Sequence, residues 1–340
     1  MKIIQVMAGD EEGGLENHFV ELANGLAHLG VDVVAVGHQK YADRFDPKVQ
    51  YRALDLSRSR KNPWVLLALA RLLRRERGDL VHAQANKAVA MLAAVARWVP
   101  GLKLATIHSQ KKSVAMYKKM DAVIGVSKGV VANLAHPQLH IVHNGMVPFR
   151  GEALSRSALA KTLGLAAQQK ITLAVGRLVK VKAYDNLINA WMPEFGQLVL
   201  IGEGPEQAAL AALIETRGLQ SQIILAGFRS DVRALMAAAD LMVFSSDREG
   251  FSYALVEALL AQLPVVSTRV AGAEDILPAE HLVAVGDPEA LRQALRAALA
   301  DPAATAARMA PAFTQAAQKL TVEHMVAQTH QIYQRMLQGS

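Results

Sequence analysis

The stretch SSDREGFSYALVEALLAQLP, residues 245–264, decides how the second half of this chain folds. Ser252 is a predicted helix N-cap, and the apolar run that follows it up to Leu260 predicts a buried helix. Pro264 ends that helix, and Val265-Val266 after it predicts a strand. The stretch is therefore predicted as a loop, a buried helix and a strand.

The loop ahead of this helix carries groups that suit a polar ligand. Glu249 stands in the loop and Glu257 inside the helix, and carboxylates are good acceptors for sugar hydroxyls. Gly250 has no Cβ, so the backbone can come close to a ligand. The free N–H groups and positive dipole end of the helix suit an anion such as a diphosphate. A buried helix with one exposed acid and one paired acid would explain the same residues without a ligand.

The run E-G-F-S-x-x-L-V-E-A-L, which begins at Glu249, resembles the signature of family 4 of the retaining glycosyltransferases. The resemblance implies the GT-B fold, an α/β architecture in which two Rossmann-like parallel-sheet domains face each other across a cleft. In that fold a C-terminal helix crosses back to the first domain. The resemblance also implies that Glu249 contacts the donor hexose and Glu257 the ribose of the sugar nucleotide. Gly250, Phe251 and Ser252 would line the donor site.

Length and composition limit the class of protein. The chain has 340 residues, enough for two domains with separate cores, and no cysteine. The lack of cysteine excludes a disulfide framework, a thiolate nucleophile and a cysteine-based metal site. The N-terminus, MKIIQVMAGDEE, turns acidic where a signal peptide would be apolar, and no apolar run reaches membrane-spanning length. We expect a cytoplasmic protein.

Positive charge is concentrated in the first half. Residues 1–150 carry 21 Lys and Arg against 12 Asp and Glu, whereas residues 151–340 carry 16 against 18. This excess indicates an anionic partner for the first half. Nucleic acid is not expected, because aromatic residues are few and no nucleic-acid-binding motif occurs.

The run WVLLALARLLRR, residues 64–75, could place Trp and Leu toward lipid and Arg toward anionic headgroups of the inner leaflet. The enzyme would then be peripheral on the inner face of the cell membrane. An ordinary crossover helix with a solvated basic end explains the run at least equally well, and the basic residues could instead bind acceptor phosphates.

The chain opens with a β-α-β pattern, which implies a parallel sheet. Gly13 and Gly14 follow the first predicted strand, Ile3–Met7, and permit close approach of a phosphate or a sugar. In the resembling family a GG loop at this point contacts the donor phosphates and the acceptor, although a tight turn alone would also explain the two glycines. His108 ends another predicted strand, where open α/β sheets bind ligands. The family places a T-x-H histidine near the donor hexose, and a structural hydrogen-bonding role is equally open.

The second half continues with glycine-containing turns after predicted strands. Arg177 and Lys182 lie in G-R-L-x-x-x-K, where a planar fork and a point charge suit the oxygens of a diphosphate. Ala183 stands where the family has a glycine, so the loop conformation is expected to differ slightly. Gly227 and Phe228 match a loop that in the family cradles the nucleotide base.

The domain boundaries follow from turn signals. Asn144-Gly145 predicts a turn, and residues 148–158 are predicted to be a linker. We expect an acceptor-binding Rossmann-like domain at residues 1–148, a nucleotide-sugar-binding one at 149–320, and a helix at 321–340 that packs back on the first domain.

The resemblance implies transfer of a hexose from a nucleotide-diphosphate sugar to a hydroxyl of a glycan or glycolipid acceptor, with retention of configuration. A UDP-sugar is favoured, GDP-mannose is the alternative, and lipopolysaccharide or another cell-envelope glycan is the implied acceptor. Arg177, Lys182, Glu249 and His108 are the predicted catalytic residues. No Asp-x-Asp motif is present, so we expect no metal or other cofactor and a front-face attack assisted by the leaving phosphate. The competing classes are a GT-B-shaped sugar-nucleotide epimerase and a nucleotide-sugar-binding protein without turnover.

Overall fold

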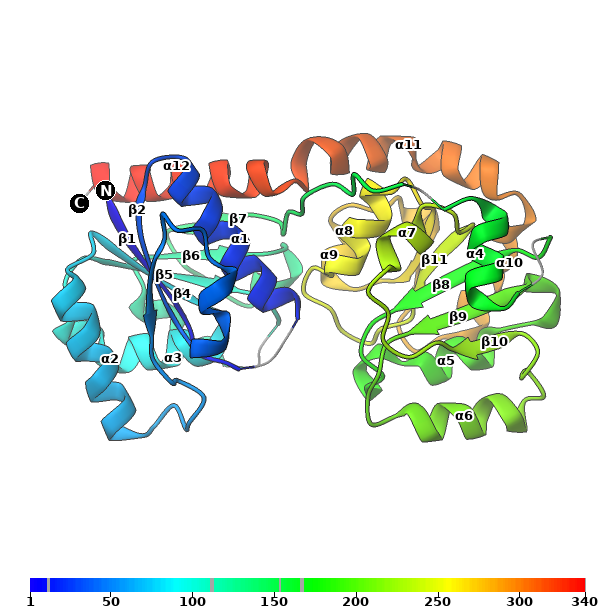
Figure 1. The fold of residues 1–340 in the computed structure, drawn as a ribbon, viewed down its shortest axis with the longest axis horizontal. Helices are drawn as coiled ribbons and strands as arrows, with labels where there is room; N and C mark the ends of the chain where they lie inside the picture. The colour runs from blue at the N-terminus through cyan, green and yellow to red at the C-terminus, as the bar shows by residue number, and fades with distance from the viewer. Residues whose placement is uncertain (11–12, 111–112, 153, 166–167, 340) are drawn as a thin grey trace. The chain divides into compact units, whose positions relative to one another are not determined.

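The computed structural model describes residues 1–340 except residues 11–12, 111–112, 153, 166–167 and 340. The chain divides into two compact units (Figure 1). Unit 1 contains residues 1–145 and 321–340, and unit 2 contains residues 146–320.

Unit 1 is built on a parallel seven-stranded sheet with the order β3-β2-β1-β4-β5-β6-β7. Its strands are β1 (Lys2–Met7), β2 (Asp32–Gly37), β3 (Gln50–Ala53), β4 (Leu80–Gln84), β5 (Leu102–Ile107), β6 (Ala122–Gly125) and β7 (Leu139–Ile141). The strand order reverses between β1 and β4. In open α/β sheets such a reversal opens a crevice beyond the carboxyl ends of the strands, where ligands bind.

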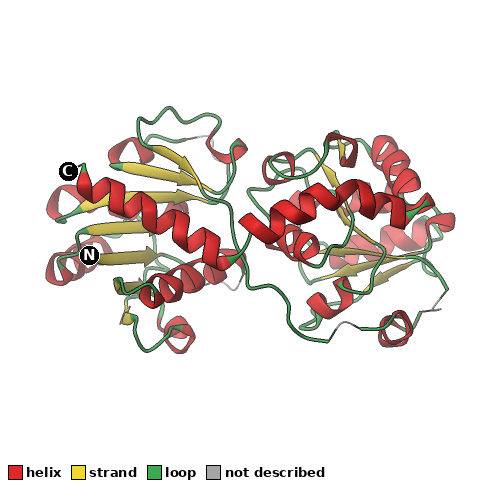
Figure 2. Cartoon of the chain, turned by 90° about the horizontal axis from the view of Figure 1, so that it is seen from above, coloured by secondary structure: helices red, strands yellow, loops and turns green. Residues whose placement is uncertain are grey.

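Unit 1 also contains α-helices and short 3-10 turns. They are α1 (Gly14–His28), η1 (Gln39–Arg44), α2 (Pro63–Glu76), α3 (Ala85–Val95), η2 (Ala96–Trp98), η3 (Tyr117–Lys119), η4 (Gly129–Val131) and α12 (Val322–Gln338). Figure 2 shows α12 as the long helix that lies along the sheet of unit 1. The expectation that the C-terminal helix returns to the first domain is confirmed.

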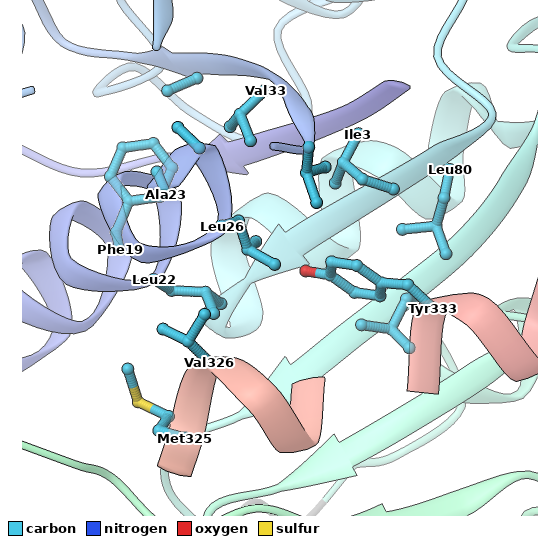
Figure 3. Packing of buried hydrophobic residues seen from close by; sticks show 14 of the residues in the cluster. Ile3, Phe19, Leu22, Ala23, Leu26, Val33, Leu80, Met325, Val326 and Tyr333 are labelled. Atoms are coloured by element: carbon cyan, nitrogen blue, oxygen red, sulfur yellow. The ribbon is translucent and has the colours of Figure 1, made fainter. Parts of the chain in front are cut away.

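Close packing of α1 against α12 holds the two ends of unit 1 together. A Cβ at Gly25 of α1 would lie 2.4 Å from Cγ2 of Val326 on α12, so the glycine is what allows the helices to approach. Figure 3 shows Val326 beside Leu22 of α1, and the buried cluster around them also includes Met325 and Tyr333 of α12. The core of unit 1 therefore depends on the C-terminal helix.

Unit 2 is built on a parallel six-stranded sheet with the order β10-β9-β8-β11-β12-β13. Its strands are β8 (Ile171–Val175), β9 (Gln197–Ile201), β10 (Ile223–Leu225), β11 (Leu241–Phe244), β12 (Val265–Thr268) and β13 (Leu282–Val283). The order reverses between β8 and β11, so this is where the crevice of unit 2 is expected.

The helices and 3-10 turns of unit 2 are α4 (Arg156–Leu163), η5 (Lys180–Lys182), α5 (Tyr184–Ala190), η6 (Pro193–Phe195), α6 (Gln207–Thr216), α7 (Val232–Met236), α8 (Tyr253–Leu260), α9 (Ala271–Glu274), η7 (Ala279–His281), α10 (Pro288–Ala300) and α11 (Pro302–Lys319). α4 begins inside the segment predicted to be a linker: Ser155 caps it by accepting a hydrogen bond from Ala158 N at 3.2 Å. The predicted class, two parallel-sheet α/β domains, is confirmed.

No helix in the described part of the chain is both long enough and apolar enough to cross a bilayer.

Candidate active site

The loops after β8 and β11 are tied together at the strand-order reversal of unit 2. Ser245 Oγ donates a hydrogen bond to the carbonyl of Lys182 at 2.9 Å, and Asp247 N donates to the carbonyl of Val181 at 2.9 Å. The ammonium group of Lys182 forms an ion pair with the carboxylate of Glu249. Two residues that the sequence analysis assigns to catalysis, Lys182 and Glu249, are thus brought into contact by the fold.

The Lys182–Glu249 ion pair is largely enclosed. Each side chain is 18% exposed, and Ser246 Oγ donates to Oε1 of Glu249 at 3.2 Å. A Cβ at Gly176 would lie 3.2 Å from Lys182 Cε and 3.0 Å from the Tyr184 hydroxyl, so the glycine makes room for both side chains. Burial, and to a lesser extent the charge of Glu249, raises the pKa of Tyr184, which therefore keeps its phenolic proton.

The loop before α8 is packed directly against α9. Gly250 and Phe251 are buried, and a Cβ at Gly272 of α9 would lie 2.6 Å from the Gly250 carbonyl oxygen. Ser252 occupies the N-cap position of α8 with an extended backbone, as predicted, but its side chain makes no capping hydrogen bond.

Glu257 of α8 is engaged by an arginine that the sequence analysis did not identify. Arg233 Nε donates to Glu257 Oε1 at 2.9 Å, and Arg233 Nη1 donates to the carbonyl of Val147 at 3.3 Å. Burial raises the pKa of Glu257 above its ordinary value, although the neighbouring guanidinium works in the opposite direction. Arg233 therefore belongs to the candidate site, because it orients the carboxylate of Glu257, the residue predicted to bind the ribose, and favours its charged form.

The remaining predicted residues of unit 2 lie on neighbouring turns. Arg177 is exposed directly after β8. Gly227 has a left-handed backbone with φ of 64° and accepts a hydrogen bond from Gly202 N at 2.8 Å. Phe228 is 75% exposed, and its backbone N–H donates to Oε1 of Glu203 at 3.4 Å. The turn thus presents a large apolar side chain on its surface.

Ala183, which stands where the family has a glycine, lies in the turn between η5 and α5. It adopts a left-handed backbone with φ of 47° between η5 and α5, and it is almost fully buried. This is a backbone geometry that glycine adopts without strain and that the Cβ of alanine disfavours.

In unit 1, Gly13 and Gly14 lie where β1 leads into α1. Gly13 precedes the helix, which begins at Gly14, and its carbonyl accepts a hydrogen bond from Asn17 N at 3.1 Å. A Cβ at Gly13 would lie 3.4 Å from Oε2 of Glu16, whose side chain is buried. The start of α1 therefore faces a carboxylate of its own helix, an arrangement that suits a hydroxyl-bearing ligand better than a phosphate.

His108 follows β5 in unit 1, as predicted, and belongs to a cluster of histidines. Its Nε2 lies 3.1 Å from Oε1 of Gln84, the last residue of β4. Its ring meets that of His18 edge-on, with 4.7 Å between the centroids.

A second hydrogen-bonded set lies beneath this pair. His82 is completely buried, with Nδ1 2.7 Å from the Tyr333 hydroxyl and Nε2 2.6 Å from Thr106 Oγ1. Burial lowers the pKa of His18 to about 4 and the pKa values of His82 and His108 well below the usual range. The three imidazoles are therefore neutral at physiological pH, and each can both donate and accept a hydrogen bond.

Among the described residues, no group of three or more His, Asp or Glu side chains is placed to hold a metal ion.

Comparison with known proteins supports the motif-based interpretation. A family model described as "Glycosyl transferases group 1" matches residues 155–319, and one described as "Glycosyltransferase Family 4" matches residues 12–148. The chain belongs to glycosyltransferase family 4. The two matched segments are separated by residues 149–154, which lie within the segment predicted to be a linker.

Similar proteins match this family 4 glycosyltransferase over nearly its whole length. The lipopolysaccharide core biosynthesis glycosyltransferase LpsE of Rhizobium meliloti is 26% identical over 318 residues, which cover 88% of this chain and 89% of LpsE. The structure of Anabaena Alr3699/HepE in complex with UDP-glucose has a TM-score of 0.85 at 20% identity and covers 98% of this chain and 100% of its own. The structure of WaaG, involved in lipopolysaccharide biosynthesis, has a TM-score of 0.73 at 19% identity and covers 97% and 99%.

These structural likenesses show that the family 4 chain has the GT-B fold. The individual roles of Arg177, Lys182, Glu249, Glu257 and His108 in a family 4 enzyme remain predictions.

Proposed function

We propose that this glycosyltransferase transfers a hexose from a nucleotide-diphosphate sugar to a hydroxyl of lipopolysaccharide or another cell-envelope glycan, with retention of configuration. It would act in the cytoplasm, at the inner face of the cell membrane. The observation that carries the proposal is the contact of Lys182 with Glu249 at the strand-order reversal of unit 2. The likeness to HepE bound to UDP-glucose supports a UDP-sugar over GDP-mannose, and the name of LpsE supports the acceptor class.

The ion pair suggests how the donor would be received. A diphosphate would compete with Glu249 for the ammonium group of Lys182, because it brings more negative charge than one carboxylate. Lys182 would then contact the phosphate oxygens, and Glu249 would accept hydrogen bonds from hydroxyls of the hexose. Arg177, exposed on the same loop, would add a second positive group.

The other predicted residues of unit 2 would hold the nucleoside. Glu257 would accept the ribose hydroxyls while Arg233 fixes its carboxylate. The exposed ring of Phe228 offers an apolar surface for the base next to Gly227. The loop formed by Gly250, Phe251 and Ser252 would place the diphosphate at the start of α8. The side chain of Ser252 makes no capping hydrogen bond there that would compete for the backbone N–H groups.

The transfer would break one bond at C1 of the hexose and form another. The C1–O bond to the β-phosphate breaks, and its electron pair stays on the phosphate oxygen. The acceptor oxygen bonds to C1 on the same face, and its proton passes to the departing phosphate. Lys182 and Arg177 would stabilise the negative charge that develops there, a role that many enzymes give to a metal ion. In unit 1, the neutral imidazole of His108 would hydrogen-bond the hexose, and the Gly13-Gly14 turn would contact the acceptor or donor.

The test is a donor panel. The full chain is mixed with UDP-glucose, UDP-galactose, UDP-N-acetylglucosamine or GDP-mannose, and both the shift in melting temperature and the release of UDP or GDP are measured. One donor should raise the melting temperature and be slowly hydrolysed without an acceptor. Turnover should survive EDTA, since protein cations are proposed to stabilise the leaving group.

Two lysines of η5 provide a matched pair of variants. Lys182→Ala should lower kcat by roughly 10²–10³-fold, by analogy with loss of one electrostatic donor elsewhere. Lys180→Ala, which removes an exposed ammonium group from the same turn, should leave kcat unchanged. Equal effects of the two changes would contradict the assigned role. Binding without turnover would identify a nucleotide-sugar-binding protein, and conversion of one UDP-sugar into another would identify an epimerase.

A further inference from the structure

α2 and α3 are neighbouring helices of unit 1 (Figure 1), and an apolar groove that the proposed transfer reaction does not use lies on their surface. The groove has a volume of about 570 Å³. Its lining residues are Pro63, Leu66, Leu67, Ala70, Arg71, Arg74, Ala94 and Trp98. We call this surface the α2–α3 face and count Trp64, next to the groove, as part of it.

Large apolar side chains of the face lie in solvent. Trp64 is 77% exposed, Leu67 40% and Trp98 48%. Trp98 is held in position by Arg97, whose guanidinium lies 4.3 Å from the centroid of the indole ring. Two exposed tryptophans beside one apolar groove are unusual on a surface that has no partner, since burial of each would be favourable.

Positive charge adjoins this apolar surface. Arg71 and Arg74 line the groove, Arg75 follows on the same helix, and all three are exposed. At helical spacing, Trp64, Leu67, Arg71 and Arg74 project from one stripe of α2, with the apolar residues in its first half and the arginines in its second.

Negative charge is absent from the face. Glu76 is the only acid of α2, and it is buried and paired with Lys2 and Arg52. The sequence contains no Asp or Glu between Leu80 and Met120, which includes all of α3 and η2. The arginines of α2 are therefore not neutralised from the neighbouring helix.

We propose that the α2–α3 face docks on an anionic lipid bilayer, with Trp64, Leu67 and Trp98 entering the headgroup region and Arg71, Arg74 and Arg75 contacting lipid phosphates. Tryptophan is suited to this boundary because its ring is apolar and its N–H remains polar. Arginine side chains can lie along apolar surface and still reach phosphate oxygens. The face thus combines the two attractions, apolar burial and charge, that a peripheral membrane helix needs.

The charge distribution argues against a second copy of this chain as the occupant. In a two-fold dimer formed through this face, the arginines of one copy would meet those of the other, which is unfavourable. The positive end of α2 also has a local benefit, because arginines in the last turn interact favourably with the helix dipole. That benefit does not account for the exposure of Trp64 in the first turn.

The docking proposal deepens the proposed membrane location, and it can fail or succeed independently of hexose transfer. The full chain is mixed with vesicles of phosphatidylcholine containing phosphatidylglycerol, and with vesicles of phosphatidylcholine alone. Binding is followed by cosedimentation and by tryptophan fluorescence with lipids brominated in the acyl chain. We expect binding to the anionic vesicles that weakens with added salt, together with quenching of tryptophan emission.

Two double variants separate the charge from the apolar contribution. Arg71→Gln with Arg74→Gln should lower the partition coefficient on anionic vesicles about 30-fold, from the usual contribution of a basic residue at such a surface. Trp64→Ser with Leu67→Ser should remove most of the quenching. The folding of each variant is checked by its melting temperature, and all four side chains are exposed, so the fold should be retained.

The matched control is Lys161→Gln with Arg217→Gln, which removes two exposed positive charges from unit 2. It should bind vesicles as the unmodified chain does. Equal loss of binding in this control, or no binding of the unmodified chain to anionic vesicles, would overturn the proposal. Binding of an RNA oligonucleotide lost in Arg71→Gln with Arg74→Gln, without vesicle binding, would instead make the face a nucleic-acid surface. Hydrolysis of the donor in the absence of vesicles should be the same in both α2 variants and in the control.

Discussion

Acidification should destabilise unit 1 through two buried histidines, His18 and His82. They are 3% and 0% exposed, and burial lowers the pKa of His18 to about 4 and that of His82 well below its usual range. In the unfolded chain both would return to a pKa of about 6.5, so below that pH the unfolded state binds protons that the folded state does not. The contribution of these two histidines to the stability of unit 1 is therefore fully present above about pH 6.5, and it is lost as the pH falls toward their folded-state pKa values.

The magnitude follows from the same linkage. About one pH unit below its unfolded pKa, each neutral histidine lowers the free energy of unfolding by about 1.4 kcal/mol. The pair should therefore lower the stability of unit 1 by about 3 kcal/mol between about pH 7.5 and about pH 5.5. This is a large part of the roughly 5–15 kcal/mol that a domain commonly has.

The assay is hydrogen exchange of peptides from β1 and β4, corrected for the intrinsic effect of pH on exchange. It reports on unit 1 alone, which matters because the raised pKa of Glu257 contributes a pH dependence of opposite sign in unit 2. His18→Gln combined with His82→Gln should remove the part of the pH dependence that these two residues contribute, about 3 kcal/mol, and leave the part that comes from His108, whose pKa burial also lowers. His28→Gln is the control, since the His28 side chain is 57% exposed, and it should keep the pH dependence of the unmodified chain.

The reasoning would be refuted by a change of less than about 1 kcal/mol across this pH range in the unmodified chain. It would equally be refuted if the double variant and the unmodified chain lost stability in parallel.

Three further changes have effects that the structure defines. Gly145→Ala should destabilise unit 1 by about 1–3 kcal/mol in urea unfolding, because its Cβ would lie 2.1 Å from the carbonyl oxygen of Thr321; an unchanged midpoint would contradict this close approach. Ala183→Gly should raise the melting temperature of unit 2, since it removes a left-handed alanine that costs about 1–2 kcal/mol, partly offset by the greater entropy of glycine when unfolded. Arg233→Ala should weaken UDP binding measured by calorimetry and raise the pKa of Glu257 further, so that the loss of affinity is greatest at low pH, where Glu257 is protonated; affinity equal to that of the unmodified chain at all pH values would exclude Arg233 from the nucleotide site.

Much of the fold could be predicted because it follows from short-range pattern. The apolar run 254–260 between Ser252 and Pro264 predicts the buried helix α8, and the β-α-β opening predicts a parallel sheet. β3 is not predicted, because Gln50–Ala53 is short and half polar and becomes a strand only by pairing with β2. The sequence analysis places Ser155 in a linker, because the single turn signal does not reveal the helix that this residue caps.

The candidate site shows the same division. Glycines after strands and the cations Arg177 and Lys182 were recognisable as a phosphate-binding pattern. Nothing in the sequence near Glu257 indicates that Arg233 is its partner, because α7 is a short helix without a motif. Nor does any local signal show that the ammonium group of Lys182 meets Glu249.

The sequence by itself determined most of the helices and strands and which turns carry acids, cations and glycines, because these properties depend on neighbours along the chain. Tertiary structure decided which of those groups meet. His82 contacts Tyr333 across 251 positions of sequence, and Gly145 is required by the backbone of Thr321 rather than by its own turn. Such contacts depend on the order in which strands join a sheet and on where a returning helix packs, and residue spacing alone does not record either.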